Sequence, residues 1–356
     1  MAVLTAVFLT LTAVLLLPAP KQDRARSHAG HEAMIAPAAT EAKRLEIPPG
    51  EEAADQAAAH HDAAPADGQT TPPSASTATP PGLAAVEEEK TIVLTSAPDP
   101  EVTEETPQGP LPVIGGDGRK PWQVYARPYA AGSIPHIAVI VAPLGGDRIM
   151  ANAAITRLPG AITLAIDALA PDAGQWFGEA RKAGHETLLL LAAEPLDYPA
   201  SDPGSGLLLI GLPAAENIRR LLDMLRQGAG YTGIMTLTGT RFVIEPQALR
   251  PVLAEIEKRG LAILDARISE RSLLADFAGQ KQMPVAVIDF RIDADLAPAE
   301  IDQTLAQAEM QARQAGYAVC LVTATSLALD RLNRWSSQLP DRGVRLVPFS
   351  AVLLRR

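Results

Sequence analysis

The chain has 356 residues, 41 acidic and 31 basic, which gives a formal net charge of −10. Residues 41–110 hold 14 of the acidic and only 3 of the basic side chains, so the rest of the chain is close to neutral. A near-neutral folded part without a clustered basic face argues against nucleic acid as a partner. The single cysteine, Cys320, excludes an internal disulfide, and its apolar surroundings in the sequence indicate a small buried side chain.

The N-terminal segment, residues 1–20, contains an apolar run from 2 to 17 that no charge interrupts. As a helix this run would span roughly 24 Å, less than the hydrocarbon core of about 30 Å. Its length lies between the core of a signal peptide and a membrane anchor, and we expect it to be one of these. The sequence therefore predicts a periplasmic or exported protein, with anchorage to the inner membrane left open and no other membrane contact.

Residues 21–121 are rich in alanine, proline, glutamate and threonine and almost lack aromatic side chains. Such a composition cannot bury enough apolar surface to offset the entropy of ordering. We expect a disordered, acidic linker over this range, followed by one folded domain over residues 122–356.

The folded domain alternates short apolar runs with segments of helical period. Three glycines, Gly184, Gly260 and Gly316, end helical segments just before a strand and fit the left-handed cap position. The predicted strands are 137–141, 162–166, 187–191, 232–237, 262–264, 285–288, 318–322 and 345–348, and the clearest helices are 214–227, 246–259 and 298–315. Strands that are apolar throughout, each followed by a helix, are typical of a parallel α/β protein. A closed barrel suits this many units better than an open sheet, because the glycine-rich phosphate loop of open sheets is missing.

Seven stretches along this domain carry a resemblance to a known family. They are IAVIVAPLG (137–145), GHE to EP (184–195), DYP to DPG (197–204), YTG to GTRF (231–242), RGL with Asp265, DFRID (289–293) and RGV to Ser350. In this order they resemble the divergent polysaccharide deacetylase family (the YibQ-like branch). The resemblance implies an α/β fold of the distorted (β/α) barrel type, and active members would remove acetyl groups from N-acetylated sugars.

The residues that the resemblance makes catalytic are replaced in this chain. Ala142 and Pro143 stand where the family has a pair of aspartates, and Leu190, Leu237 and Thr323 stand where it has histidines. A zinc-type site needs imidazoles or carboxylates that converge on the ion. The folded domain keeps two histidines, His136 and His185, both expected at the end of the barrel opposite the active face. We therefore predict no catalytic residue, no metal site and no cofactor.

Five polar residues remain near strand ends and are the candidate substrate-binding residues: Glu194, Arg241, Asp265, Asp289 and Asp293. Carboxylates and arginine hydrogen-bond sugar hydroxyls, so these side chains could line a glycan cleft. The alternative is structural, with Asp265 and Asp293 capping helices and Arg241 paired with one of them. An acid/base pair of Asp289 and Asp293 is disfavoured, because four residues of extended chain separate them by roughly 13 Å.

The sequence thus favours a degenerate deacetylase-like domain of the cell envelope, linked to carbohydrate metabolism, that binds a glycan or an envelope protein and is catalytically inactive. Two alternatives stay open. One is an active metal-dependent carbohydrate deacetylase with substituted ligands, because its activity requires only some metal-activated water or equivalent base. The other is a purely structural partner in an envelope assembly.

Overall fold

The computed structural model describes residues 92–201 and 204–353. The predicted signal or anchor (1–20) and the predicted linker up to residue 91 lie outside these residues. None of the helices in the described ranges is long and apolar enough to cross a membrane.

The described residues begin at 92, and regular structure forms before the predicted boundary at 122, so the linker prediction is wrong for residues 92–121. This segment forms a short helical turn, η1 (Pro100–Val102), a hairpin of β1 (Thr103–Thr106) and β2 (Gly109–Pro112), and helix α2 (Pro121–Val124). Its apolar side chains Leu94, Val102 and Leu111 are buried. Arg181 fastens the start of the segment, because its guanidinium donates to the carbonyl oxygen of Thr95 at 2.7 Å.

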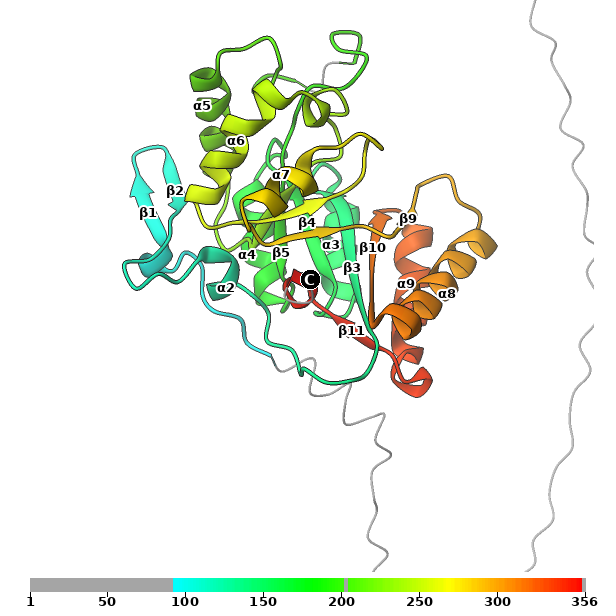
Figure 1. Ribbon diagram of the computed structural model, residues 1–356. Helices are drawn as coiled ribbons and strands as arrows, with labels where there is room; N and C mark the ends of the chain where they lie inside the picture. Colours follow the sequence, from blue (N-terminus) through cyan, green and yellow to red (C-terminus); the bar gives the residue numbers. More distant parts are fainter. Residues whose placement is uncertain (1–91, 202–203, 354–356) are drawn as a thin grey trace, which may run out of the picture. The chain divides into compact units, whose positions relative to one another are not determined.

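A nine-stranded parallel sheet forms the centre of the domain (Figure 1). Its strands are β3 (His136–Leu144), β4 (Thr163–Asp167), β5 (Thr187–Leu190), β6 (Gly233–Met235), β7 (Ala262–Asp265), β8 (Val285–Val287), β9 (Phe290–Ile292), β10 (Tyr317–Thr323) and β11 (Arg345–Val347). The order is β8-β7-β6-β5-β4-β3-β10-β9, with β11 added beside the start of β3. The predicted α/β fold of the distorted (β/α) barrel type is confirmed.

One extended segment, residues 285–292, joins the two ends of this curled sheet. Its first half, β8, pairs with β7, and its second half, β9, pairs with β10. Between them the N–H of Ile288 donates to Asp265 O at 3.2 Å, and the N–H of Asp289 donates to Val319 O at 2.8 Å. The barrel is distorted because a single segment changes its strand partner from β7 to β10 at this point. The sequence predicts one simple strand here.

Helices follow the strands and cover the outside of the sheet, with α5 and α6 on one flank and α8 and α9 on the opposite flank (Figure 1). They are α3 (Arg148–Arg157), α4 (Ala173–Lys182), α5 (Ala214–Leu225), α6 (Pro246–Lys258), α7 (Leu274–Gln280), α8 (Pro298–Ala315), α9 (Ser326–Gln338) and α10 (Ser350–Leu353), with short turns η2 (Phe242–Ile244) and η3 (Pro340–Arg342). Asp147 begins α3 by accepting the N–H groups of Ile149 and Met150. The predicted cap glycines Gly184, Gly260 and Gly316 all have positive φ, as expected.

The strands are buried on both faces, which explains their continuous apolar runs. Alternate residues of β3 show the pattern: Ala138, Ile140 and Ala142 point into the lumen, whereas Val139 and Val141 pack under the helices. The lumen is filled with side chains that include Met235, Leu264 and Phe349. It is a packed apolar core, so a ligand site formed by the strands themselves must lie at an end of the barrel.

A buried polar cluster closes the end of the barrel where the strands begin. Glu186 lies there, fully buried just before β5. Its Oε1 accepts the N–H of Ser350 at 2.9 Å, and its Oε2 accepts the Ser350 hydroxyl at 2.6 Å and the N–H of Arg127 at 3.0 Å. Burial raises the pKa of Glu186, against the lowering effect of these donors. The cluster therefore ties the N-terminal segment and the C-terminal helix α10 to one side chain.

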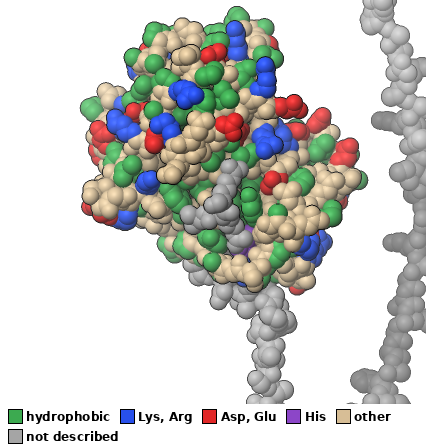
Figure 2. All heavy atoms as spheres, in the orientation of Figure 1, with side chains coloured by type: hydrophobic (Ala, Val, Ile, Leu, Met, Phe, Trp, Pro, Cys, Tyr) green, Lys and Arg blue, Asp and Glu red, His purple; other side chains and the backbone are tan. Residues whose placement is uncertain are grey.

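The face drawn in Figure 2 carries acidic and basic side chains side by side. Many of the charged side chains in the described residues are ion-paired, such as Lys281 with Glu257 at 2.6 Å and Arg148 with Asp172 at 3.0 Å. Pairs of this exposure contribute little to stability.

Candidate functional site

The end of the barrel at which the strands finish is called here the mouth. Ala142, Leu190 and Leu237, the positions that the resemblance associates with metal ligands or a base, all belong to the lumen core at this end. Ala142 lies beside Thr323 in the β3–β10 pair, and Leu190 lies beside Asp167 in the β4–β5 pair. These three positions of the floor are therefore alkyl, and alkyl groups neither coordinate a cation nor accept a proton.

Two polar residues at the mouth were not among the sequence candidates. Asp167 is the last residue of β4 and lies two residues after Ala165, which points into the lumen, so it is on the same side of the strand. Its Oδ1 accepts the N–H of Leu169 at 2.8 Å. Arg291 of β9 donates from Nη1 to Ala266 O at 3.2 Å and so spans from β9 to the end of β7. A signal existed for Asp167, which directly follows an apolar run. Arg291 lies inside the DFRID motif. The side of the sheet on which its side chain lies depends on the change of strand partner at residue 289, which the sequence does not reveal.

Glu194 and Arg241 are brought together, at 3.1 Å between Oε1 and Nη1. Glu194 is buried, and its Oε2 accepts the N–H of Ile210 at 2.7 Å. The prediction that Arg241 pairs with Asp265 or Asp293 is wrong, because the loop after β5 places Glu194 beside Arg241 and the two side chains form the ion pair. The pair holds that loop against the turn that follows β6.

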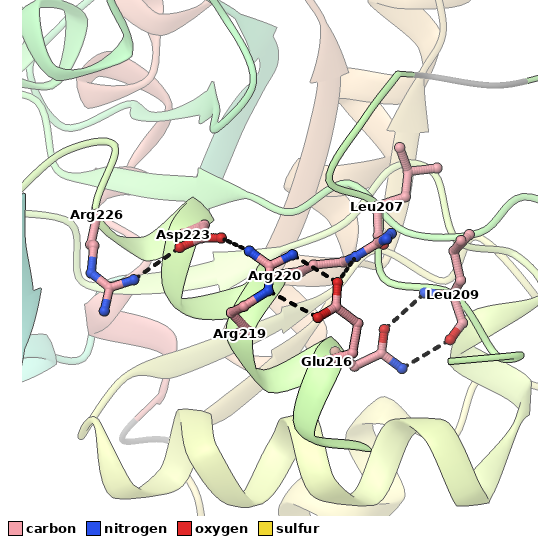
Figure 3. Close-up of polar contacts among 8 residues, drawn as sticks. Leu207, Leu209, Glu216, Arg219, Arg220, Asp223 and Arg226 are labelled. Carbon is pink, nitrogen blue, oxygen red and sulfur yellow. Dashed lines mark hydrogen bonds and ion pairs between the residues drawn. The ribbon is translucent and has the colours of Figure 1, made fainter. Parts of the chain in front are cut away.

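The same loop is fastened from its far end by α5 (Figure 3). Asn217 accepts the N–H of Leu209 at 3.0 Å and donates to its carbonyl oxygen at 2.9 Å. Arg220 donates to Leu207 O at 2.7 Å and is itself held by Glu216 at 2.9 Å. Residues 204–212 are thus fixed by side chains at both ends, and the rim of the mouth at this position is preformed.

Asp265 faces outward, because its lumen-facing neighbours in the β7 run are Leu264 and Ala266. Its Oδ2 accepts the Ser272 hydroxyl at 3.0 Å and the N–H of Ala275 in α7 at 3.3 Å. This supports the predicted alternative in which Asp265 stabilises the start of the following helix. The carboxylate has no path to the mouth through the sheet.

Asp289 and Asp293 lie on either side of β9 and have different contacts. The Oδ2 of Asp289 accepts the N–H of Val319 at 2.8 Å, so the carboxylate replaces a backbone carbonyl where the barrel closes. Asp293 pairs with Arg291 at 3.3 Å. The predicted helix cap by Asp293 is wrong. The N-cap residue of α8 is Ala297, whose N–H donates to Glu300 at 2.7 Å.

The two histidines and the cysteine of the described residues lie away from the mouth. Both ring nitrogens of His185 lie near carbonyl oxygens, of Ile162 at 2.8 Å and Ile155 at 3.1 Å, and burial lowers the pKa of this imidazole. His136 is buried at the start of β3. Burial raises the pKa of the Cys320 thiol. Within residues 92–201 and 204–353 no three His, Cys, Asp or Glu side chains gather as a metal site would require.

Comparisons with known proteins identify the family. A model of the family described as divergent polysaccharide deacetylase matches residues 139–353. The crystal structure of the uncharacterized protein ATU2773 from Agrobacterium tumefaciens C58 is 36% identical, covers 68% of this chain and 99% of that one, and has a TM-score of 0.67. No protein with a curated description matches.

Two further solved structures overlap only weakly. One is BA3943 from Bacillus anthracis, a CE4 family pseudoenzyme, with 12% identity, coverage of 62% of this chain and 66% of that one, and a TM-score of 0.30. The other is a variant of the peptidoglycan deacetylase PdaC from Bacillus subtilis, with 12% identity, coverage of 62% and 92%, and a TM-score of 0.31. Scores this low support no inference about the present protein. The family match and the ATU2773 structure agree with the fold described above, and the chain belongs to the divergent polysaccharide deacetylase family.

Proposed function

We propose that this protein is a catalytically inactive member of its family that binds an envelope protein at the mouth of the barrel. The observation that carries the proposal is the alkyl floor formed by Ala142, Leu190 and Leu237. Deacetylation needs a metal-activated water or an equivalent base, together with a group that stabilises the oxyanion. These three side chains offer none of these.

The carboxylates around the floor are engaged by the fold, and among them Asp167 accepts the N–H of Leu169 through its Oδ1. The carboxylate of Glu194 is engaged by Ile210 and Arg241, and that of Asp289 by Val319. Asp265 faces away from the mouth toward α7. Each carboxylate therefore stabilises the fold, and a role for these side chains in substrate binding remains a secondary proposal.

A row of exposed aliphatic side chains favours a protein partner over a glycan. Ile149, Leu169, Leu196 and Leu327 are 75, 38, 69 and 37% exposed. They follow β3, β4, β5 and β10, which are neighbours in the sheet, so each of four adjacent strands contributes one aliphatic group to the rim. Aliphatic rims bind apolar polypeptide surfaces, whereas sugar faces stack on aromatic rings.

A glycan is the second candidate, and Tyr198 is the observation that favours it. This ring is half-buried in the loop after β5, close in sequence to the rim residue Leu196. Placement in the envelope rests on the apolar run at 2–17 and is part of the proposal.

Metal content and acetyl-sugar hydrolysis test the inactivity directly. The full chain would be incubated with zinc, nickel, manganese or magnesium, separated by gel filtration and measured by elemental mass spectrometry, in parallel with acetate release from N-acetylated sugar oligomers. We expect less than a tenth of an equivalent of metal, roughly the level of nonspecific carry-over, and no acetate. About one equivalent with acetate release would establish the active deacetylase instead.

Charge substitutions on the rim test the binding surface. Ile149→Asp and Leu196→Asp should abolish recovery of envelope protein partners by chemical cross-linking, whereas Met310→Asp, at a 54% exposed position on α8, should leave it unchanged. Equal recovery with all three variants would refute the rim as the interface. Retained glycan binding that is lost in Tyr198→Ala would support the second candidate.

A further inference from the structure

A groove on the outer surface, between α8 and α9, lies away from the mouth and is not used by the proposed function. Its volume is about 310 Å³, within the range of small-ligand sites. The lining residues come from both helices and from η3: Asp302, Ala306, Glu309, Arg331, Arg334, Trp335, Gln338 and Arg342.

The two carboxylates of this α8–α9 groove are already engaged. Asp302 pairs with Arg331 at 2.9 Å. Glu309 is buried, and its Oε1 accepts both the Trp335 indole N–H at 2.8 Å and Arg342 Nη1 at 2.7 Å. Its Oε2 accepts from Arg313 at 3.3 Å. Glu309 thus shares one negative charge between two guanidinium groups.

Arg334 is left without a counter-charge. It lies on the groove side of α9, one turn after Arg331, and its side chain makes neither a hydrogen bond nor an ion pair with any residue that the structure describes. Gln338, one turn further, uses its amide oxygen to accept from Arg342, so the amide NH₂ is the group that it offers to the groove. Three guanidinium groups and two carboxylates line the groove, and the groups still available are hydrogen-bond donors.

We propose that the α8–α9 groove binds a phosphate group, with Arg334 as its main anchor and Gln338 as a second donor. A guanidinium fork fits the tetrahedral oxyanion with two parallel N–H bonds, and phosphate supplies the acceptors that the groove lacks. The phosphate belongs to a free phosphate compound or to a lipid headgroup, because both present the same oxyanion. This site is independent of the mouth.

Titration with inorganic phosphate tests the site, with the Trp335 indole N–H as reporter. The full chain would be followed by ¹H–¹⁵N NMR, in which three tryptophan side-chain signals are expected from the sequence. Saturable movement of the Trp335 signal is expected, with affinity reduced roughly tenfold or more in Arg334→Gln, the loss expected for one charge-assisted contact. The Arg334 side chain is exposed and makes no hydrogen bond or ion pair with a described residue, so this variant should remain folded.

Arg271→Gln is the matched control. Arg271 is an exposed arginine of the loop before α7, and its side chain has no bond to any described residue. Its removal should leave phosphate affinity unchanged. Equal affinity in Arg334→Gln and the original chain, or no saturable binding, would overturn the proposal.

Vesicles distinguish the two sources of phosphate. Sedimentation with phosphatidylglycerol vesicles that is lost in Arg334→Gln supports a lipid headgroup. Saturable binding of inorganic phosphate without vesicle binding supports a free phosphate compound.

Discussion

Substitution of Glu186 by glutamine should destabilise the protein although it preserves shape and removes a buried charge. The two carboxylate oxygens each accept a backbone N–H, Oε1 from Ser350 at 2.9 Å and Oε2 from Arg127 at 3.0 Å. An amide has one oxygen, so in either orientation its NH₂ faces one of these N–H groups. One buried backbone donor loses its acceptor, which costs about 1–3 kcal/mol.

Glu186→Ala removes the acceptors of both N–H groups and of the Ser350 hydroxyl, and it should cost more than about 3 kcal/mol. Equilibrium unfolding in urea, followed by tryptophan fluorescence, measures both variants. Hydrogen exchange should quicken first in α10, the helix that Glu186 holds. Glu270→Gln, at an exposed glutamate, is the control and should lie within about 0.5 kcal/mol of the original chain.

The pH dependence gives a second test of the same contact. Burial raises the pKa of Glu186 in the fold, so its neutral form is favoured there. The stability from this effect is complete below the unfolded pKa of about 4.3 and is lost as the pH rises through the folded pKa. The Glu186→Gln variant has no such titration. The unfolding free energy of the original chain should therefore exceed that of the variant by less as the pH rises. A constant or widening difference, or a glutamine variant as stable as the original chain, would refute this account of Glu186.

Three other predictions concern the sheet and the mouth. Asp289→Ala should cost about 1–3 kcal/mol, because the N–H of Val319 loses its acceptor, whereas Asp289→Asn keeps an oxygen and should cost less than half as much in urea unfolding. Gly233→Ala should lower the melting temperature by several degrees or prevent folding, since the added carbon would lie 2.4 Å from a backbone oxygen of β7; an unchanged melting temperature would contradict the packing of β6. Glu194→Gln should quicken hydrogen exchange at Ile210 with little effect on exchange in α8, and uniform protection would show that Glu194 does not hold its loop.

Most strands could be placed from the sequence because burial on both faces makes them apolar throughout. The cap glycines were placed for a similar reason, since a positive φ at Gly184 and Gly316 demands a residue without a side chain. The segment 92–121 could not be recognised, because β1 reads TEET and β2 reads GPLP. Its order comes from distant contacts such as that of Arg181 with Thr95, which no local pattern records.

The candidate site was predicted only in part, for reasons of phase and partner choice. A strand that is apolar on both faces gives no sign of which residues point inward, so the outward direction of Asp265 was not readable. Arg241 pairs with Glu194 because of the path of the loop after β5. That path is fixed by α5 through Asn217, a contact that no local sequence pattern records. The alkyl positions Ala142 and Leu190, in contrast, were identified by the resemblance and lie at the mouth as expected.

The change of partner within residues 285–292 also limits how this domain can associate with other chains. The two ends of the nine-stranded sheet are β8 and β9, strands of only three residues each, and one segment carries both of them. Edges this short give little template for an added strand, which is the usual route to strand exchange and fibrous aggregation. A partner that extends the sheet is therefore disfavoured, and recognition by this barrel must rely on side chains.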